Sequence, residues 1–357
     1  MNKLFKLFTI LTLSIITICS SLVFVKGYGS GFKTKGDFTY VLNGKNAQIV
    51  WYNGKSSTVK IPAEIDGNKV VKIGIDATDE YIDDFDYSEH YGFAGNKYIK
   101  SVTVPNTVTR IATASFADCP NLKNVSIGKG VKCISLLLFD NCKELKSISL
   151  PSSITEIDEL AFRNSGLKTI SIGKNVKYIS RAAFENSKLT KITVSSKNKK
   201  YSSASGVLYN KNKTNLHIYP NCRKGTKFTI PKTVKQVMPY AFTGNKTLNK
   251  VVFSKSINKI GSNSFEKRKK LKKVVFKSKK KIKIAPRAFM NCKALKSVTV
   301  PKNVIKIATK AFGFYSYTDK NGDYKEAKIE GFTIKGKKGS TAYKYAKKYK
   351  FKFVPEK

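Results

Sequence analysis

The sequence has few of the side chains on which most enzymes depend. Its 357 residues include one tryptophan and only two histidines, His90 and His217. Neither histidine has a nucleophile or a metal-ligand motif beside it, so neither supports a hydrolase triad or a zinc site. GxSxG, HExxH, P-loop and strand–GxGxxG–helix motifs are absent as well. We therefore expect no catalytic residue, no bound metal and no cofactor, and we interpret His217 as an ordinary strand residue.

Acidic residues and arginine are also scarce. The chain has 68 Lys and Arg against 23 Asp and Glu, which gives a net charge of +45, and only six of the basic residues are arginine. Lysine is a hydrated point charge, whereas arginine is the usual residue for bidentate recognition of bases. The composition therefore favours diffuse attraction to a polyanion over sequence-specific nucleic-acid recognition, and we expect no sequence-specific nucleic-acid partner. A lysine-rich surface that only keeps the protein soluble is the alternative.

Cysteine usage argues against a disulfide framework or a zinc site. One of the six cysteines, Cys19, lies near the N-terminus, and the other five form an odd number without CxxC spacing. Cys119, Cys142 and Cys292 each follow a phenylalanine by three residues. That regularity indicates a packing position, where free cysteine acts as a small apolar residue. We expect buried thiols, with a Cys119–Cys142 disulfide as the alternative.

The first 27 residues have the pattern of a secretory signal peptide. Lys3 and Lys6 make a basic start, and an apolar run follows. Cleavage after Gly27 is expected, a cut near Ser20 is a second possibility, and an uncleaved anchor is a third. The residue before Cys19 is Ile18, which does not suit a lipoprotein signal. No later stretch is apolar enough to span a bilayer.

An internal repeat is the strongest signal in the chain. Nine phenylalanines recur in steps of 23, 23, 23, 22, 58, 23, 24 and 23 residues, at Phe93, Phe116, Phe139, Phe162, Phe184, Phe242, Phe265, Phe289 and Phe312. An isoleucine or valine precedes most of them by five residues, and a leucine or isoleucine follows five or six residues later. Two further apolar positions then alternate with polar ones, such as Val102/Val104 and Val298/Val300.

This alternation is typical of a short strand with one buried face. A strand of about five residues cannot bury its apolar side alone, but strands stacked as a parallel ladder about 4.8 Å apart bury it together. We therefore predict a β-rich repeat solenoid with one short parallel strand per coil of about 23 residues and with caps at both ends.

The repeat resembles a known family. Segments such as Ile148–Phe162 and Val298–Phe312 are similar to the BspA-type leucine-rich repeat, which reads IP-x-x-V-x-x-I-x-x-x-AF-x-x-C-x-x-L. The resemblance runs from about residue 38 to the end of the chain. It implies a secreted or surface-exposed bacterial protein, and it implies adhesion, often to extracellular-matrix proteins.

Departures from the repeat suggest the organisation of the chain. After the signal peptide (1–27), we expect an N-terminal cap and first coils with an acidic insert (28–92), then the repeat array (93–312) and a C-terminal hairpin and helix cap (313–357). The 58-residue step contains a predicted hairpin insert (195–231), with two short apolar runs around a polar turn. A second hairpin turn is predicted at Asn321–Gly322.

The acidic insert, residues 76–90, begins with Asp76 and carries six further carboxylates, at Asp79, Glu80, Asp83, Asp84, Asp86 and Glu89. Such a cluster could bind Ca²⁺ through oxygen ligands, but its spacing matches no known calcium loop. A solvated insert that offsets nearby lysines is the preferred interpretation. Asp319, Asn321 and Asp323 imitate the start of an EF-hand, but Tyr324 replaces the required glycine, so we reject a calcium loop there.

Candidate binding residues follow from the strand alternation. If Val102 and Val104 point inward, Ser101 and Thr103 point outward. The predicted ligand-binding face consists of Ser101, Thr103, Asn124, Ser126, Ser147, Ser149, Thr169 and Ser171, and the outward pairs continue as Lys191/Thr193, Lys250/Val252, Lys273/Val275 and Ser297/Thr299. A column of lysines precedes this face and is the predicted polyanion-binding set, Lys100, Lys123, Lys146, Lys168, Lys272 and Lys296. Ordinary solvated strands would show the same residue types.

Two functions from different classes remain open at this stage. One is a secreted or cell-surface adhesin-like protein that binds a host or cell-envelope macromolecule through the strand face and inserts. The other is a structural cell-envelope protein held by its positive charge on anionic wall polymer or membrane. The sequence does not identify the ligand, because repeat scaffolds keep their core and vary their surface.

Overall fold

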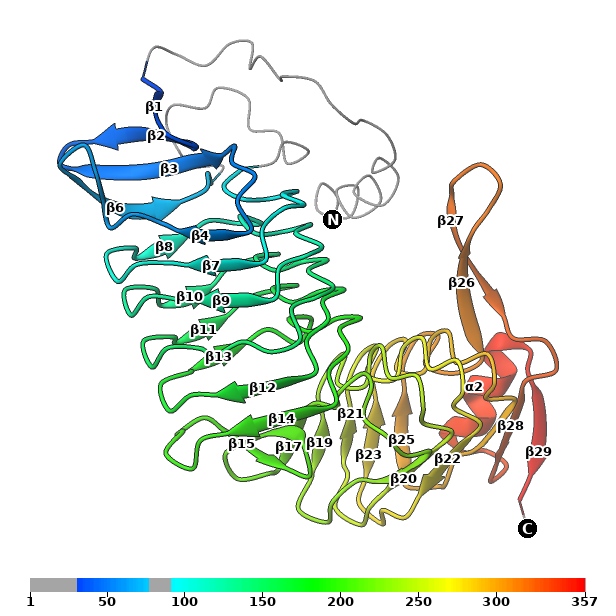
Figure 1. Ribbon diagram of the computed structural model, residues 1–357. Coiled ribbons are helices and arrows are strands. Elements are labelled where there is room, and N and C mark those ends of the chain that lie inside the picture. Colours follow the sequence, from blue (N-terminus) through cyan, green and yellow to red (C-terminus); the bar gives the residue numbers. More distant parts are fainter. Residues whose placement is uncertain (1–30, 77–90, 357) are drawn as a thin grey trace.

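The computed structural model describes residues 31–76 and 91–356, and it shows a β-solenoid (Figure 1). The predicted strand forms a parallel ladder along one side, here called the first ladder. Its strands are β4 (Thr58–Lys60), β7 (Ser101–Thr103), β9 (Asn124–Ser126), β12 (Thr169–Ile172), β14 (Lys191–Val194), β18 (Lys227–Thr229), β20 (Lys250–Phe253), β22 (Lys273–Phe276), β24 (Ser297–Thr299), β28 (Thr333–Gly336) and β29 (Lys352–Pro355). The prediction of a parallel repeat solenoid is confirmed.

Most coils also carry a second strand that the sequence analysis did not predict. These strands make a second parallel ladder, in which the isoleucine or valine five residues before each phenylalanine points inward. The strands are β3 (Asn46–Tyr52), β6 (Asn68–Ile73), β8 (Arg110–Ile111), β10 (Cys133–Ile134), β11 (Glu156–Ile157), β13 (Tyr178–Ile179), β17 (Asn215–Ile218), β19 (Gln236–Val237), β21 (Lys259–Ile260), β23 (Ile282–Ile284) and β25 (Val304–Ile307). Many have only two residues, which is too short to produce a readable alternation in the sequence.

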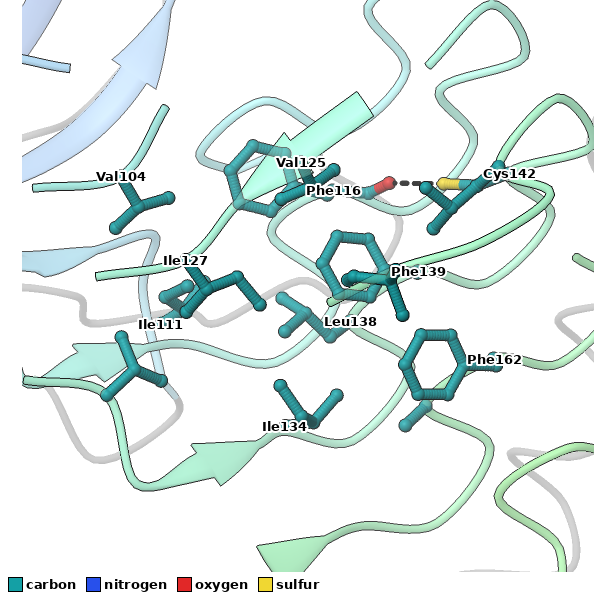
Figure 2. Packing of buried hydrophobic residues seen from close by; sticks show 14 of the residues in the cluster. Val104, Ile111, Phe116, Val125, Ile127, Ile134, Leu138, Phe139, Cys142 and Phe162 are labelled. Atoms are coloured by element: carbon teal, nitrogen blue, oxygen red, sulfur yellow. Dashed lines mark hydrogen bonds between the residues drawn. The ribbon is translucent and has the colours of Figure 1, made fainter. Parts of the chain in front are cut away.

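The repeated phenylalanines stack on one another inside the solenoid. All nine are buried, and consecutive rings lie nearly parallel with centroids 4.5 to 5.8 Å apart where both belong to the same stack. Figure 2 shows Phe116, Phe139 and Phe162 in this arrangement beside Ile134 and Leu138. The 23-residue period therefore reflects one aromatic ring contributed by each coil to a continuous column.

Tight corners flank each phenylalanine. The residue two positions after it has positive φ in eight coils, and this position is often asparagine or glycine, as in Asn141, Asn164 and Gly244. These residue types enter the left-handed region most easily. The residue two positions before the phenylalanine also has positive φ in most coils, even when it is Leu137 or Leu160. Packing of the buried ring holds these leucines in a conformation that costs about 1–2 kcal/mol.

The predicted hairpin insert contains three antiparallel strands, β15 (Tyr201–Ala204), β16 (Val207–Asn210) and β17. It breaks the first ladder between β14 and β18, and the aromatic stack breaks at the same place. The second stack begins with Tyr219, which lies 23 residues before Phe242 and packs on it at 4.8 Å. The buried residues accordingly form two large clusters that meet at the insert.

The solenoid bends at this insert and has two arms (Figure 1). The first arm runs from β3 to β14 and the second from β17 to α2. The buried core divides between the two arms, so the coils do not stack as one straight rod. The physical reason is that β15–β16–β17 add residues to one side of a single coil, so the next coil cannot stack flat.

Non-repetitive elements cover both ends of the array. At the start, β1 (Lys33–Lys35), β2 (Phe38–Asn43) and β5 (Glu64–Ile65) extend the sheet of β3 and β6. At the end, β26 (Phe314–Thr318) and β27 (Tyr324–Lys328) form the second predicted hairpin, which projects from the solenoid in Figure 1. The helix α2 (Thr341–Tyr349) follows, and the hydroxyl of its Tyr345 both accepts from the Phe312 N–H at 3.0 Å and donates to the Phe312 carbonyl at 2.8 Å.

Candidate binding surface

The first arm brings the predicted ligand-binding residues together on its first ladder. Register pairs Ser101 with Asn124 and Thr103 with Ser126, and a further bridge joins Ser126 to Ser149. Seven of the eight side chains are exposed, and Ser101 is half-buried. We call this surface the polar strand face, which comprises Ser101, Thr103, Asn124, Ser126, Ser147, Ser149, Thr169 and Ser171.

A shallow, open depression lies at the end of the polar strand face nearest the bend. It is lined by 147–150, 169–173 and 193–195, which belong to three successive coils. Within it the hydroxyls of Ser171 and Thr193 are 2.9 Å apart and share a hydrogen bond. Because the outward side chains are short, they leave the surface of the ladder open. Such a surface offers many donors and acceptors and no acidic side chain.

Sequence reasoning missed part of this depression. Thr193 was recognised as an outward residue but not as part of the site, and Ser195 was not considered. Both belong to the coil just before the hairpin insert, where Ser195 donates its backbone N–H to Ile172 at 3.0 Å and so stays in line with the preceding coil. The register of three adjacent coils was the signal, and it becomes visible only when those coils are stacked.

The outward pattern fails at one position in the second arm. Val252 was predicted to point to solvent, yet only 3% of its surface is exposed. Thr229 and Val275 lie beside it in register on β18 and β22. Neighbouring side chains of this size cover one another across parallel strands. The prediction for Val252 was therefore wrong, because its side chain is buried and does not face solvent.

The predicted lysine column is divided into two groups. Lys123 donates its N–H to the carbonyl of Lys100, and Lys168 does the same to Lys146, each at 2.9 Å, so these four lysines lie on consecutive coils. Lys272 and Lys296 lie in the second arm. Thr226 and Asn249 occupy the corresponding position in the coils before Lys272, as the bonds from Lys250 to Thr226 and from Lys272 to Asn249 show. The six lysines therefore do not form one uninterrupted track.

An acid sits within the first group of lysines. The ammonium of Lys146 lies 3.0 Å from Glu144. The hydrogen bond from Lys146 lowers the pKa of the Glu144 carboxyl below its ordinary value, and the charges of Lys123 and Lys168 lower it further. The Glu144 carboxylate therefore offsets part of the positive charge of this group.

The described cysteines form no disulfide. Cys119, Cys142 and Cys292 are fully buried, and each donates its S–H to a phenylalanine carbonyl of the preceding coil at 3.0 to 3.1 Å, as Figure 2 shows for Cys142. Burial raises the pKa of Cys119 and of Cys292 to about 12. The prediction of buried thiols at a packing position is confirmed, and protonated thiols of this kind are poor nucleophiles.

His217 has the surroundings of a structural residue. It lies in β17 with its ring edge against Tyr201, at a centroid distance of 5.4 Å. Burial lowers its pKa to about 4, and the charge of Arg181 acts in the same direction. The imidazole is therefore neutral at physiological pH, and its placement in a strand confirms the prediction. His90 lies outside the described residues.

Carboxylates in the described residues serve structural roles. Asp76 is buried and pairs with Arg110 at 2.6 Å and with Lys72 at 3.2 Å. Burial alone would raise the pKa of the Asp76 carboxyl, but the two cations outweigh this effect, so the pKa lies below its ordinary value. Asp319 accepts from the backbone N–H groups of Asn321 and Asp323 and thereby holds the hairpin turn. The described ranges contain no cluster of three or more His, Cys, Asp or Glu suited to a metal ion. The predicted signal peptide (1–27) and the six carboxylates between Asp79 and Glu89 in the acidic insert lie outside the described residues.

The repeated coil of this solenoid matches a known family of repeats. The family model for the BspA type leucine rich repeat region matches residues 88–211 and 212–330 in six copies. The chain belongs to this family. No curated protein sequence matches this BspA-type protein significantly. In the described residues, no helix is long and apolar enough to cross a membrane.

Solved structures share the fold. The pneumococcal vaccine antigen PcpA is 19% identical, with a TM-score of 0.58 over 93% of this chain and 100% of that one. A leucine rich cell surface protein from Faecalibacterium prausnitzii is 23% identical, with a TM-score of 0.51 over 89% and 97%. A leucine-rich repeat protein from Eubacterium ventriosum is 25% identical, with a TM-score of 0.51 over 80% and 92%.

Proposed function

We propose that this BspA-type protein is an exported, surface-exposed binding protein that holds a macromolecular ligand on the polar strand face of its first arm. The observation that carries this proposal is the depression over Ser147–Leu150, Thr169–Gly173 and Thr193–Ser195, the shallow hollow on the first ladder. The depression contains Ser147, Ser149, Thr169 and Ser171 of the predicted polar strand face, together with Thr193 and Ser195 of the next coil. The signal-like start of the chain and the cell-surface description of the Faecalibacterium prausnitzii protein support export.

The chemistry of this face favours a polar partner that is read by hydrogen bonds. Hydroxyl groups both donate and accept, so a ladder of Ser and Thr can meet an extended backbone or a glycan without selecting for charge. The face is also pre-organised, because the hydrogen bonds between coils fix the strands that carry it. Little entropy is therefore lost when a ligand settles on it. A host matrix protein is the partner that the family resemblance suggests.

A capture experiment tests this proposal. Mature protein is incubated with immobilised matrix proteins and with purified wall polymer at low and high salt. We expect a matrix protein to be retained at high salt, because contacts by neutral hydroxyls are insensitive to screening. Ser149→Tyr and Ser171→Tyr place rings across the depression and are expected to weaken retention at least ten-fold. Thr233→Tyr, at an exposed turn of the second arm, is the matched control. Retention unchanged by both tyrosines at the depression would refute the proposed face.

A second candidate function is retention at the cell envelope by positive charge. The observation that favours it is the stacking of Lys100, Lys123, Lys146 and Lys168 on consecutive coils. A polyanion laid across stacked lysines releases counterions, and the resulting affinity falls steeply with salt. Washing intact cells separates the two functions. Protein held by charge elutes at moderate salt, whereas protein held by the polar strand face or by an uncut signal segment stays.

A further inference from the structure

Positive charge is distributed unevenly along the chain. Residues 186–318 contain 33 Lys and Arg but a single acid, Glu266, whereas the rest of the chain has 35 basic and 22 acidic residues. This stretch contains the last coil of the first arm, the hairpin insert and the coils of the second arm up to the projecting hairpin. Most of the net charge of +45 therefore lies in this part of the chain, which total composition does not reveal.

Part of this charge is stacked in register on the first ladder of the second arm. Lys227 pairs with Lys250, and Lys250 pairs with Lys273, on the parallel strands β18, β20 and β22. Strands in such a ladder lie about 4.8 Å apart, so the three side chains leave the surface side by side. Lys272 directly precedes Lys273, and Lys296 precedes the next strand. We call these five residues the lysine ladder; four are exposed and Lys250 is half-buried.

The lysine ladder has no acidic partner in the part of the chain that the structure describes. Among the described residues, none of its five members forms an ion pair within 4 Å. The first group of lysines differs in this respect, because Glu144 binds Lys146 and lies within the influence of Lys123 and Lys168. Stacked like charges without an internal partner attract mobile anions. The lysine ladder is thus the stronger anion-binding surface of the two.

We propose that the lysine ladder binds a linear phosphate polymer that runs from coil to coil along the second arm. This inference rests on the second candidate function, in which positive charge holds the protein on an anionic polymer. Lysine acts as a point-charge phosphate binder, and the ladder contains no arginine for planar, bidentate recognition. The exposed hydroxyls of Thr229, on the same strand as Lys227, and of Thr299, on the strand that follows Lys296, can donate to phosphate oxygens. The polar strand face of the first arm stays free, so the protein is able to hold a wall polymer and a second ligand at once.

The test measures binding of mature protein to long-chain inorganic polyphosphate as a function of salt. We compare three triple variants, each of which removes three positive charges. They are the ladder variant Lys227→Gln/Lys250→Gln/Lys273→Gln, the first-group variant Lys100→Gln/Lys123→Gln/Lys168→Gln and the control Lys55→Gln/Lys129→Gln/Lys174→Gln. The ladder variant is expected to bind about ten-fold more weakly at 0.1 M salt and to lower the slope of log affinity against log salt by about 2. The corresponding triple Lys→Arg variant keeps the charge and is expected to bind normally.

Each outcome decides between the proposals. Greater loss in the ladder variant than in the other two supports the lysine ladder. Equal loss in all three variants shows that only total charge matters. Loss confined to the first-group variant moves the binding site to the first arm. Either result overturns the lysine ladder as the binding site but leaves the proposal of retention by charge intact. Binding to heparin but not to polyphosphate overturns the phosphate assignment. If the unaltered protein binds neither polymer at 50 mM salt, retention by charge itself is wrong.

Discussion

Truncation of one stacked phenylalanine is expected to weaken two junctions of the solenoid at once. Phe139 is fully buried, and its ring centroid lies 5.8 Å from that of Phe116 and 5.5 Å from that of Phe162. Removing a buried phenylalanine side chain typically costs about 3–5 kcal/mol, and each aromatic pair adds about 0.5–1.5 kcal/mol beyond its buried area. The range of 3–5 kcal/mol already includes the contacts of the ring, so the loss of two aromatic pairs places Phe139→Ala at its upper end, and we expect the free energy of unfolding to fall by about 4–5 kcal/mol.

Urea unfolding followed by circular dichroism measures this loss. Tyr178→Ala is the matched control, because Tyr178 is an aromatic residue with 51% of its surface exposed, and its truncation is expected to change stability by less than about 0.5 kcal/mol. In a repeat array each coil contacts mainly its neighbours. A double-mutant cycle of Phe116 with Phe139 should therefore show coupling of about 0.5–1.5 kcal/mol, whereas Phe139 with Phe289, in the other arm, should show none.

Two results would refute this reasoning. The first is a loss below about 1 kcal/mol for Phe139→Ala, which would mean that the ring is not packed between its neighbours. The second is coupling between Phe139 and Phe289 as large as that between adjacent rings. That result would mean that the two arms share one cooperative core, against the division at the insert.

Three further predictions concern buried polar groups. Burial lowers the folded pKa of His217 to about 4, so the imidazole stays neutral in the folded protein. Its contribution to stability is therefore complete above its unfolded pKa of about 6.5 and is lost as the pH falls from there towards 4. NMR titration of the imidazole checks this, and a folded pKa near 6.5 would contradict it. Burial raises the pKa of the Cys292 thiol to about 12. At pH 8 a thiol reagent should therefore label the half-buried Cys222 first and reach Cys292 only after unfolding. Peptide mapping that finds equal labelling of the two cysteines in native protein would disprove this. Asp140→Ala leaves the guanidinium of Arg163 without its paired carboxylate. We expect the free energy of unfolding, measured by thermal melting, to fall by about 3 kcal/mol. A loss below about 1 kcal/mol would show that solvent screens the pair.

The sequence was sufficient to predict the first ladder, because its strands bury every second residue and repeat at a constant interval. The phenylalanine column and the buried cysteines were predictable for the same reason. The second ladder was not, because two-residue strands such as Cys133–Ile134 leave no alternation to read. Tyr219 lies 23 residues before Phe242, but as a tyrosine it does not belong to the phenylalanine repeat from which the coils were predicted.

Other features depend on how coils meet, which a single sequence does not show. The bend follows from β15 and β16, whose antiparallel pairing was predictable but whose effect on the stacking of the next coil was not. Val252 is buried although it stands at an outward position of its strand, so its burial is invisible to a rule that considers one strand. The lysine ladder likewise appears only after Lys227, Lys250 and Lys273 are placed in register. Of the candidate site, the polar strand face was predicted and its last coil was missed.

The polar strand face is tested most directly by a hydrogen-exchange footprint. The mature protein is compared with and without the matrix protein that it retains at high salt. We predict slower amide exchange at Ser101–Thr103, Asn124–Ser126, Ser147–Ser149 and Thr169–Ile172, with no change in the second ladder at β19 and β21. Protection confined to the β26–β27 hairpin or to the second ladder, with the polar strand face unchanged, would contradict the account.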